Sequence, residues 1–406
     1  MSAAPATTAR WASATSIDPD TRRAAAEAAD RAAHELGEGP VDLALAFFSA
    51  AHAAAAERAA AVLRERLVPR TLLGVSAHGV VSSEHEIEGK PAFTVLAGRL
   101  PGVEVRPFVL VPESWAEAAS DAAEFARLAP GVAGAELVLL AGDPFSLDVE
   151  RVLAGVNRHA QGVRVVGGMA SAAPRPGGNA LILNDWVASE GGVAVALAGA
   201  VRVDVIVSQG CRPVGPPLEA TRVRGNLLLE LDGEPALERA ERVLQELPEA
   251  ERGRLEHGLY VGRPVRPGAA GPGDYLIRNL LGADREHGAI AVGDRIAERE
   301  RVRLHVRDAS TAREDLELLL SPQAFDARAE AALLFACNSR GVGLYGRPDG
   351  DLRTLQAALG GPLPTAGMFC AGELGPVGGV NFLHGHTASI ALIRSGRAAP
   401  AGGAGI

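Results

Sequence analysis

Two cysteines and a glutamate near the carboxyl end are the residues best suited to chemistry. Cys337 ends the apolar run AALLFAC, while Cys370 and Glu373 lie together in the glycine-rich stretch TAGMFCAGELGP. A thiol beside a carboxylate can serve as a nucleophile, a metal ligand or part of a binding pocket. Free cysteines are also among the most buried residues of ordinary cores. The residue types alone therefore leave a reactive thiol, a ligand contact and a buried structural cysteine open.

An arginine follows the first of these cysteines. Arg340 lies three residues after Cys337, in FACNSRG. Its planar guanidinium suits carboxylates, which it binds through two parallel hydrogen bonds. Glu373, which follows Gly372, would complement an ammonium group. If the ligand is an amino acid, we expect Arg340 to hold its carboxylate and Glu373 its ammonium group.

A second polar stretch, GVSAHGVVSSEHE, contains Ser76, His78 and Gly79 at the carboxyl end of a predicted strand. Open α/β sheets bind ligands at that end of their strands, so we expect these residues to line a polar pocket. The competing interpretation is a surface turn. A Ser–His catalytic pair has no third group to orient it here, and the stretch is not a G-x-S-x-G nucleophile elbow. We therefore expect a binding protein and not an enzyme.

Two more polar pairs end predicted strands. His384 and His386 are two apart and would face one side of a strand, as ligands of a metal or of haem iron could. The alternative is two surface histidines at a turn. Arg307 and Asp308 lie between a strand and a helix. Arg307 is a candidate ligand contact, whereas Asp308 is typical of a helix cap.

The bulk composition excludes several classes of function. The chain has 406 residues and a net charge of −9, without a basic block, which argues against nucleic acid as the main partner. The three cysteines are far apart, so neither a disulfide scaffold nor a cysteine-rich zinc site is expected. No apolar run reaches about 18 residues, and the amino terminus lacks an apolar signal segment. We expect a cytoplasmic protein without membrane insertion.

The elements that must position these residues follow one plan three times. Segments 41–99, 135–200 and 331–394 each read as apolar strand, helix, strand ending in Gly, Ser or Ala, loop and apolar strand. Such a unit is typical of a parallel strand pair to which the last strand is added antiparallel. We predict an α/β fold of duplicated strand–helix–strand units, which form mixed sheets flanked by helices in two associated domains.

Local patterns make finer predictions. A helix should begin in DPDTRRAAAEAADRAAHELG, with Asp18 as its cap and Gly37 at its end. TLLGVSAHGVV should be a strand, while NALILND and GGVAVALAGAVRVDVIVSQG should form hairpin strands. Residues 201–323 differ from the repeated plan, because strands there alternate with Pro/Gly turns.

Long motifs in this order resemble the FIST family. RWASATSIDPD, VDLALAFFSA and LLGVSAHGVV are similar to the start of the FIST N-terminal domain, and VSQGCRPVGPPLEATRVRGNLLLELDGEPAL to the junction that follows. LHVRDASTAREDL, LLFACNSRG and AGMFCAGELGP are similar to the FIST C-terminal domain. The resemblance covers nearly the whole chain. We accordingly expect a lead-in at 1–40, an N-terminal domain at 41–210, a C-terminal domain at 211–395 and a disordered tail at 396–406.

The resemblance implies a sensory module that binds a small ligand and signals to a partner, and amino acids are one ligand class that it implies. No kinase, receptor or cyclase region is visible, so a separate signalling protein would carry the output. Some relatives are haem-containing nitric-oxide sensors, which leaves haem open although no cofactor is expected. A thiol-dependent enzyme and an interaction scaffold are further alternatives. The family brings no catalytic residues, and its motif positions here are Gly74, Ser76, Gly79, Gly210, Cys211, Arg307, Asp308, Cys337, Arg340, Gly341, Gly367, Gly372 and Glu373. From these motifs and the residue chemistry, the expected ligand contacts are Ser76, His78, Gly79, Arg307, Cys337, Arg340, Cys370, Gly372 and Glu373.

Overall fold

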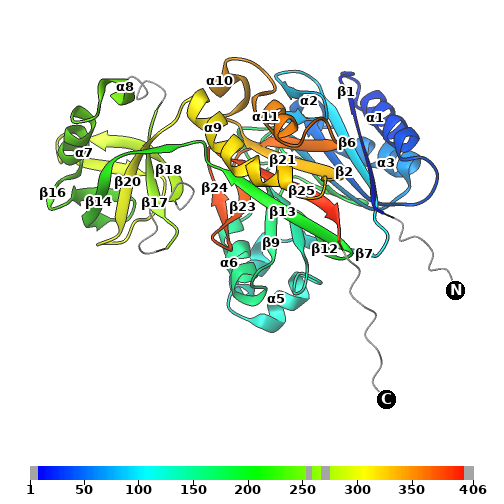
Figure 1. Cartoon of the computed structure of the whole chain (residues 1–406). Helices are drawn as coiled ribbons and strands as arrows, with labels where there is room; N and C mark the ends of the chain where they lie inside the picture. The colour runs from blue at the N-terminus through cyan, green and yellow to red at the C-terminus, as the bar shows by residue number, and fades with distance from the viewer. Residues whose placement is uncertain (1–7, 253–257, 267–274, 397–406) are drawn as a thin grey trace. The chain divides into compact units, whose positions relative to one another are not determined.

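The computed structural model describes residues 8–252, 258–266 and 275–396. The chain forms two compact units, shown in Figure 1. The first unit takes residues up to 207, then 319–383 and 387 onward, and the second takes 208–318 and 384–386. None of the helices in the described ranges is both long and apolar enough to cross a membrane.

The first unit contains the three repeated segments. In the structure each segment also takes residues that precede it in the chain (10–40, 103–134 and 201–208, respectively), and each of these larger segments supplies six strands. The first segment supplies β1 (Arg10–Ser16), β2 (Val41–Ser49), β3 (Pro69–Ala77), β4 (Gly79–Val81), β5 (Glu86–Glu88) and β6 (Phe93–Arg99), with helices α1 (Thr21–Leu36), α2 (Ala50–Ala53) and α3 (Ala56–Leu67). The second supplies β7 (Val103–Leu110), β8 (Leu137–Gly142), β9 (Arg164–Met169), β10 (Leu181–Leu183), β11 (Trp186–Ala188) and β12 (Gly192–Gly199), with α4 (Trp115–Ala118), α5 (Ala122–Leu128) and α6 (Val149–His159). The third supplies β13 (Val201–Ser208), β21 (Ala331–Cys337), β22 (Thr365–Cys370), β23 (Glu373–Val377), β24 (Val380–His384) and β25 (Ala388–Ser395), with α10 (Gly341–Tyr345) and α11 (Gly350–Ala358).

Each segment builds most of one sheet and gives a hairpin to another. The first sheet has the order β1-β6-β2-β3-β10-β11, the second β24-β23-β9-β8-β12-β7 and the third β13-β25-β21-β22-β4-β5. A parallel pair joined by a helical crossover lies inside each sheet: β2–β3, β8–β9 and β21–β22. The exchange is cyclic, because the second segment completes the first sheet, the third completes the second, and the first completes the third. The predicted mixed α/β fold is confirmed.

The three sheets share one central core. Their facing sides contribute Leu45, Leu139, Leu333 and other buried apolar residues to a single cluster. Alanine-rich α1 and α3 cover the other side of the first sheet, where small side chains let helix and sheet approach closely (Figure 1). Helices α5 and α6 cover the second sheet in the same way. Each parallel pair is therefore buried on both faces, which explains its nearly continuous apolar sequence.

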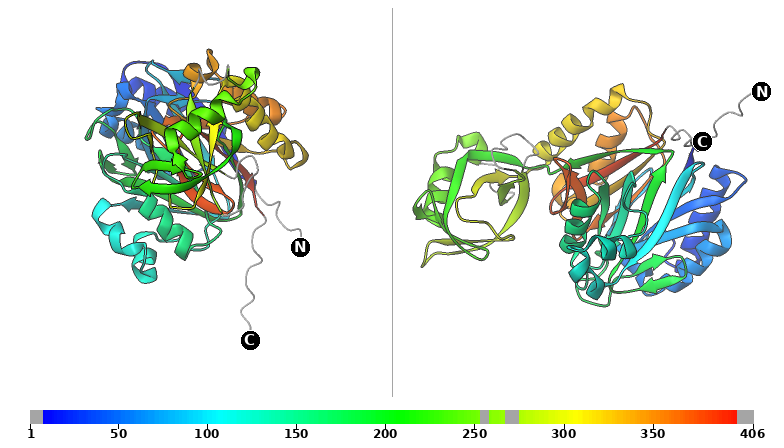
Figure 2. Two further views of the ribbon diagram at one scale, coloured as in Figure 1. Left: turned by 90° about the vertical axis from the view of Figure 1, so that its left-hand side faces the viewer. Right: turned by 90° about the horizontal axis from the view of Figure 1, so that it is seen from below.

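The second unit is a small barrel with its own core. It contains β14 (Arg212–Arg224), β15 (Leu227–Leu231), β16 (Glu234–Pro235), β17 (Leu259–Pro264), β18 (Tyr275–Asp284), β19 (Ala289–Val292) and β20 (Arg301–Val306), with α7 (Ala236–Gln245) and α8 (Glu249–Arg252). Its strands follow the order β14-β20-β17-β18-β19-β15-β16, and a further β14–β15 pairing closes the ring, as Figure 2 shows. Helix α7 packs Ala240 and Val243 against the barrel core. Helix α9 (Ala309–Leu320) leads the chain back to the first unit.

Several local predictions were wrong for physical reasons. The cap of α1 is Asp20, whose side chain accepts a hydrogen bond from the Arg23 amide, and Asp18 lies before it. The stretch TLLGVSAHGVV is not one strand, because it breaks at His78 into β3 and β4, which belong to different sheets. The strands after NALILND do not form one hairpin either, since β12 and β13 also pair in different sheets. Local periodicity does not encode which strand a segment will meet.

The compact units cut the chain differently from the expected division at residue 210. The sequence that follows the barrel returns to the first unit, where it supplies most of the third sheet. Residues 397–406 of the expected tail lie outside the described residues.

Candidate functional site

The carboxyl ends of β3, β9 and β22 are joined to one another. The amide of His78 donates to Ser171 Oγ (2.8 Å), and Ser171 Oγ donates to the Phe369 carbonyl (2.6 Å). The Met169 amide donates to the Gly372 carbonyl (2.8 Å). Strand ends from all three segments thus meet at one place. This is the sheet edge at which α/β proteins bind ligands.

Cys337 and Cys370 lie opposite each other at this edge. They are register partners on parallel strands β21 and β22, so their side chains face the same side of the third sheet. Cys337 is half-buried, whereas Cys370 is fully buried. Burial, followed by the nearby Glu373 and Cys337, raises the pKa of Cys370 well above its ordinary value. Cys370 is consequently a poor nucleophile, and Cys337 is the more accessible thiol.

Glu373 is fully buried beside the two thiols. Its Oε2 accepts hydrogen bonds from the Thr387 amide (3.1 Å) and from Thr387 Oγ1 (2.8 Å). In each sheet, the added hairpin pairs with a glycine of the parallel strand beside it. Leu374 pairs with Gly167 in the second sheet. Its equivalents are Val81, which pairs with Gly367, and Ile182, which pairs with Gly74. Glu373 therefore occupies the position that apolar Val80 and Leu181 occupy in the other two hairpins.

The other two segments show which hydrogen bond the fold requires at this place, namely an acceptor for the amide that precedes the last strand. Thr387 immediately precedes β25, and its equivalents in the other two segments are Ala92 before β6 and Gly191 before β12. The Ala92 amide donates to Ser49 Oγ (3.0 Å), and the Gly191 amide donates to Ser146 Oγ (2.9 Å). A serine hydroxyl is thus enough for this acceptor role. Burying a carboxylate there is costlier than burying a hydroxyl. The Thr387 amide needs an acceptor, but it does not by itself require a carboxyl group at Glu373.

Ser76, His78, Gly79 and Gly372 support the strand ends in different ways. Ser76 is fully buried, and its Oγ accepts a hydrogen bond from the Ala180 amide (2.8 Å), so it connects β3 to the neighbouring hairpin. The His78 side chain is exposed. A Cβ on Gly79 would lie 2.8 Å from the Ile87 carbonyl oxygen, and Gly372 carries a φ of 158°. The two glycines therefore meet backbone requirements at this edge.

Arg340 forms a buried ion pair. Its Nε donates to Asp351 Oδ2 (2.7 Å), and its Nη2 donates to Tyr345 Oη (2.8 Å) and to Asp351 Oδ1 (2.5 Å). Arg340 and Asp351 are both completely buried. The guanidinium thus has the fork geometry expected from the sequence, but the carboxylate it holds belongs to the same chain.

Acids from the first segment extend this network. Glu86 on β5 accepts a hydrogen bond from the Leu352 amide through Oε1 (2.8 Å), and its own amide donates to Asp349 Oδ1 (2.8 Å). Burial and the nearby Asp351 raise the pKa of Glu86 to about 8. Glu88 accepts from the amide of Val342 (2.9 Å). Sequence reasoning missed this network, because these partners lie more than 250 residues apart.

Arg307 belongs to the second unit. Its side chain is buried, and its Nη1 donates to Nδ1 of His386 (3.2 Å). His386 Nε2 in turn donates to Asn279 Oδ1 (2.6 Å), so both ring nitrogens of His386 are engaged. This arrangement does not fit axial ligation of haem by His386. Asp308 caps α9 by accepting from the Thr311 amide (2.8 Å), as expected. Within the described ranges, no three His, Cys, Asp or Glu side chains are grouped to hold a metal ion.

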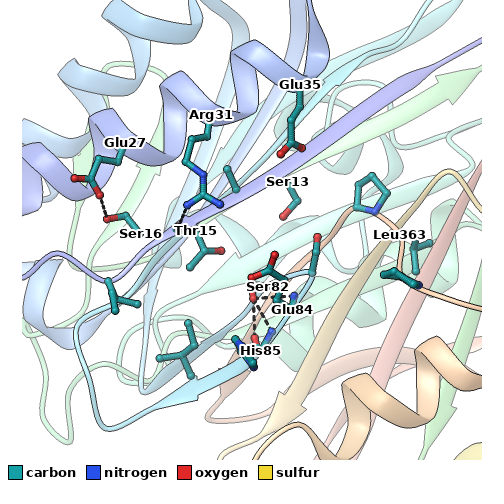
Figure 3. A pocket seen from close by; sticks show the side chains of 16 residues that line it. Ser13, Thr15, Ser16, Glu27, Arg31, Glu35, Ser82, Glu84, His85 and Leu363 are labelled. Carbon is teal, nitrogen blue, oxygen red and sulfur yellow. Dashed lines mark hydrogen bonds between the residues drawn. The ribbon is translucent and has the colours of Figure 1, made fainter.

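A separate cavity of about 530 Å³ lies along β1 (Figure 3). Helix α1 contributes Glu27, Arg31 and Glu35 to its wall, and the turn after β4 contributes Glu84 and His85. Glu27 accepts a hydrogen bond from Ser16 Oγ (2.6 Å), and Arg31 Nη1 donates to the Thr15 carbonyl (2.8 Å). Residues 82–85 of this wall belong to the polar stretch GVSAHGVVSSEHE, but the residues of that stretch expected to line a pocket, Ser76, His78 and Gly79, are not among the lining residues.

Comparisons with known proteins place these features in a family. A family model described as the FIST N domain matches residues 42–234, and one described as the FIST C domain matches residues 236–376. An uncharacterized protein of Mycobacterium tuberculosis is 39% identical over 381 residues, which cover 93% of this chain and 97% of the relative. An uncharacterized protein of Mycobacterium bovis is 38% identical over 380 residues, with 92% and 96% covered.

Solved structures offer weaker likenesses. A cyanuric acid hydrolase from A. caulinodans matches at 8% identity with a TM-score of 0.35 and covers 96% of this chain and 99% of its own. Another structure of cyanuric acid hydrolase matches at 10% identity with a TM-score of 0.29, over 96% of this chain and 100% of its own. Scores this low carry no conclusion about fold or activity.

Proposed function

The chain belongs to the FIST family, whose domains are generally sensory and bind small ligands, and on that premise we propose that it senses a small ligand at the carboxyl ends of β21 and β22. Cys337, Cys370 and Glu373 converge there. The observation that carries the proposal is the fully buried carboxylate of Glu373 at a position where the other two segments have Val80 and Leu181.

The chemistry of this edge favours a ligand with an ammonium group. Glu373 supplies a buried carboxyl group, and the charge-assisted hydrogen bond that a carboxylate makes to an ammonium group is stronger than a neutral one. Arg340 already forms a buried ion pair with Asp351, so it need not hold the ligand's carboxylate. An amino acid remains the proposed ligand, with its ammonium group at Glu373 and no demand for a carboxylate clamp at Arg340.

The proposal is binding and not catalysis, with the output passed to a separate protein in the cytoplasm. The raised pKa of the Cys370 thiol favours binding, because a thiol that stays protonated is a poor nucleophile.

Calorimetry on the purified full chain tests the proposal. The ligands are the common amino acids and, for each one that binds, the amine that lacks its carboxylate and the acid that lacks its ammonium group. We expect the amine to keep most of the affinity and the acid to lose it. Glu373→Gln keeps an acceptor for Thr387 but removes the charge, so it should weaken binding about tenfold or more.

Glu35→Gln, a neutral replacement at an exposed acid of α1, is the matched control and should bind like the wild type. Failure of every amino acid and amine to bind would refute the proposal. So would a Glu373→Gln variant that binds with wild-type affinity.

A further inference from the structure

Strand β1 has an unpaired outer edge among the described strands. It is the end strand of the first sheet and pairs antiparallel with β6, Thr15 opposite Thr94. The Thr15 carbonyl accepts a hydrogen bond from Arg31 Nη1, so it points away from β6. In an antiparallel pair, the amide and carbonyl of one residue point the same way. The Thr15 amide therefore also faces outward, and by the same alternation so do those of Trp11 and Ser13.

Two cavities follow this edge along the whole strand. The cavity of about 530 Å³ is lined by every residue from Ser13 to Ile17, and a second of about 380 Å³ is lined by Ala9, Arg10 and Trp11. Residues 362–364 line both cavities. The outer edge of residues 9–17 thus runs beside a nearly continuous depression, which we call the edge groove. At the usual rise of a strand, nine residues span about 30 Å.

The walls of the edge groove leave room for an extended chain. The α1 side chains Glu27, Arg31 and Glu35 form one wall, and they share a helix face because they are four residues apart. The turn 82–85 and the segment 362–364 form the other wall (Figure 3). A flat sheet edge of a second globular copy would meet these walls before it reached β1.

We propose that the edge groove docks an extended, basic peptide segment of a partner protein, which adds to β1 as a further strand. Backbone groups of residues 11, 13 and 15 would supply the pairing that exposed sheet edges offer to peptides. Charge selects the partner in the larger cavity, where Glu27, Glu35 and Glu84 outnumber Arg31 beside His85. The smaller cavity is lined by Arg10, Arg328 and Glu330, so the acidic part of the edge groove is the part along residues 13–17. Arg31, which is exposed and covers the Thr15 carbonyl, moves aside when the peptide binds.

The turn 82–85 belongs to the β4–β5 hairpin, which pairs with β22 in the third sheet. Its turn lines the groove, while Glu88 on β5 binds the amide of Val342, five residues after Cys337. A partner in the groove would thus contact an element that touches the proposed ligand edge. This link rests on the proposed function, whereas peptide docking itself does not.

Fluorescence anisotropy with labelled nonapeptides tests docking on the full chain. The probes alternate threonine and valine around one central lysine, and a matched probe has glutamate in its place. Two more lysine probes carry N-methyl groups on alternate residues, on the odd or on the even positions. We expect the lysine probe to bind at least tenfold more tightly than the glutamate probe. One methylation pattern should abolish binding and the other should not, because each blocks a single edge of the peptide.

Two variants of Thr15 test whether the peptide pairs with the backbone of β1. Thr15→Pro removes the outward amide at a position where an edge strand tolerates proline, and should weaken the lysine probe tenfold or more. Thr15→Val keeps the amide and should bind within about twofold of the wild type. Circular dichroism melts check that both variants fold. Glu35→Gln should weaken the peptide, and Glu373→Gln should not, so failure here is distinct from failure of the ligand proposal.

Three results would overturn the proposal. The first is that no probe binds up to its solubility limit. The second is that both methylated probes, or both Thr15 variants, bind alike. The third is a dimer seen by light scattering that Thr15→Pro dissociates and the peptide does not, which would make a second copy of the chain the occupant.

Discussion

At the scale of single residues, the three segments act as controls for one another. Each strand end needs a small residue at the position of Cys370 and a hydrogen-bond acceptor for the amide that precedes the last strand. Ala77 is opposite Ser49 in the first segment, as Cys370 is opposite Cys337 in the third. The thiol and the carboxylate of the third segment exceed these needs. That excess is the reason to place function there.

The two thiols should differ sharply in reactivity. Cys370 is fully buried and its pKa is raised, whereas Cys337 is half-buried and sits at the end of its strand. Only the thiolate reacts, so iodoacetamide at pH 7.5 should alkylate Cys337 at least about tenfold faster than Cys370. Peptide mass spectrometry over time measures both rates. Protein in urea is the control, in which the rates should converge. Equal rates in the native protein would contradict the assigned burial.

Glu86 should make stability fall as the pH rises. Its folded-state pKa of about 8 lies above its ordinary value, so the folded protein holds a proton that the unfolded chain releases between about pH 4.5 and 8. Asp349 and Asp351 face it as acids, and Arg340 is the cation nearby. The free energy of unfolding should drop across this range by on the order of 1–3 kcal/mol from this group.

Glu86→Gln, which cannot ionise, is the comparison. Urea titrations at pH 5 and pH 8.5 should show a smaller loss of stability for the variant than for the wild type. Identical pH dependence in the two proteins would mean that Glu86 is ionised throughout.

At the scale of elements, one glycine recurs two or three residues before the end of the second strand of each parallel pair. Gly74, Gly167 and Gly367 pair with the hairpins that complete the three sheets. A Cβ at Gly167 or Gly367 would lie 1.9 or 1.8 Å from a backbone carbonyl oxygen of the parallel neighbour. At Gly74 it would lie 3.1 Å from Ile182, whose side chain can shift. The three equivalent glycines are thus packed differently, against backbone in two sheets and against a side chain in the third.

This difference predicts unequal effects of one substitution. Gly367→Ala and Gly167→Ala should lower the free energy of unfolding by about 3 kcal/mol or prevent folding, because the backbone cannot move away. Gly74→Ala should cost less than about 1 kcal/mol. Urea unfolding of the three variants measures the costs. Equal costs at Gly74 and Gly367 would refute the packing described here.

At the scale of the whole molecule, the cyclic exchange of hairpins makes the first and third segments depend on each other for complete sheets. The first segment gives β4 and β5 to the third sheet, and the third segment gives β23 and β24 to the second sheet. The central core takes residues from all three sheets. The portion that matches the FIST N domain, 42–234, is therefore not a complete structural body.

A fragment of residues 1–234 should not fold cooperatively. It lacks the strands that complete the second sheet and the partners of its own β4–β5 hairpin, so it would expose part of the central core. Circular dichroism melting and proton–nitrogen correlation spectra compare the fragment with the full chain. We expect a broad melt and poor dispersion. A sharp transition with native-like dispersion would show that the exchanged hairpins are dispensable.

Local sequence was enough to predict most of the repeated elements, their threefold plan, the family and the placement of Cys337 and Cys370 near strand ends. It left open whether the two cysteines lie close together. Periodicity and turn residues report which side chains are buried and where strands stop, and both depend on neighbours along the chain. Pairing between distant strand edges does not depend on neighbours along the chain. The Glu86 contact with Leu352, the Asp351 partner of Arg340 and the groove along β1 arise only when segments far apart are brought side by side. Tertiary structure decided these, because backbone edges carry the same hydrogen-bonding groups whatever their sequence.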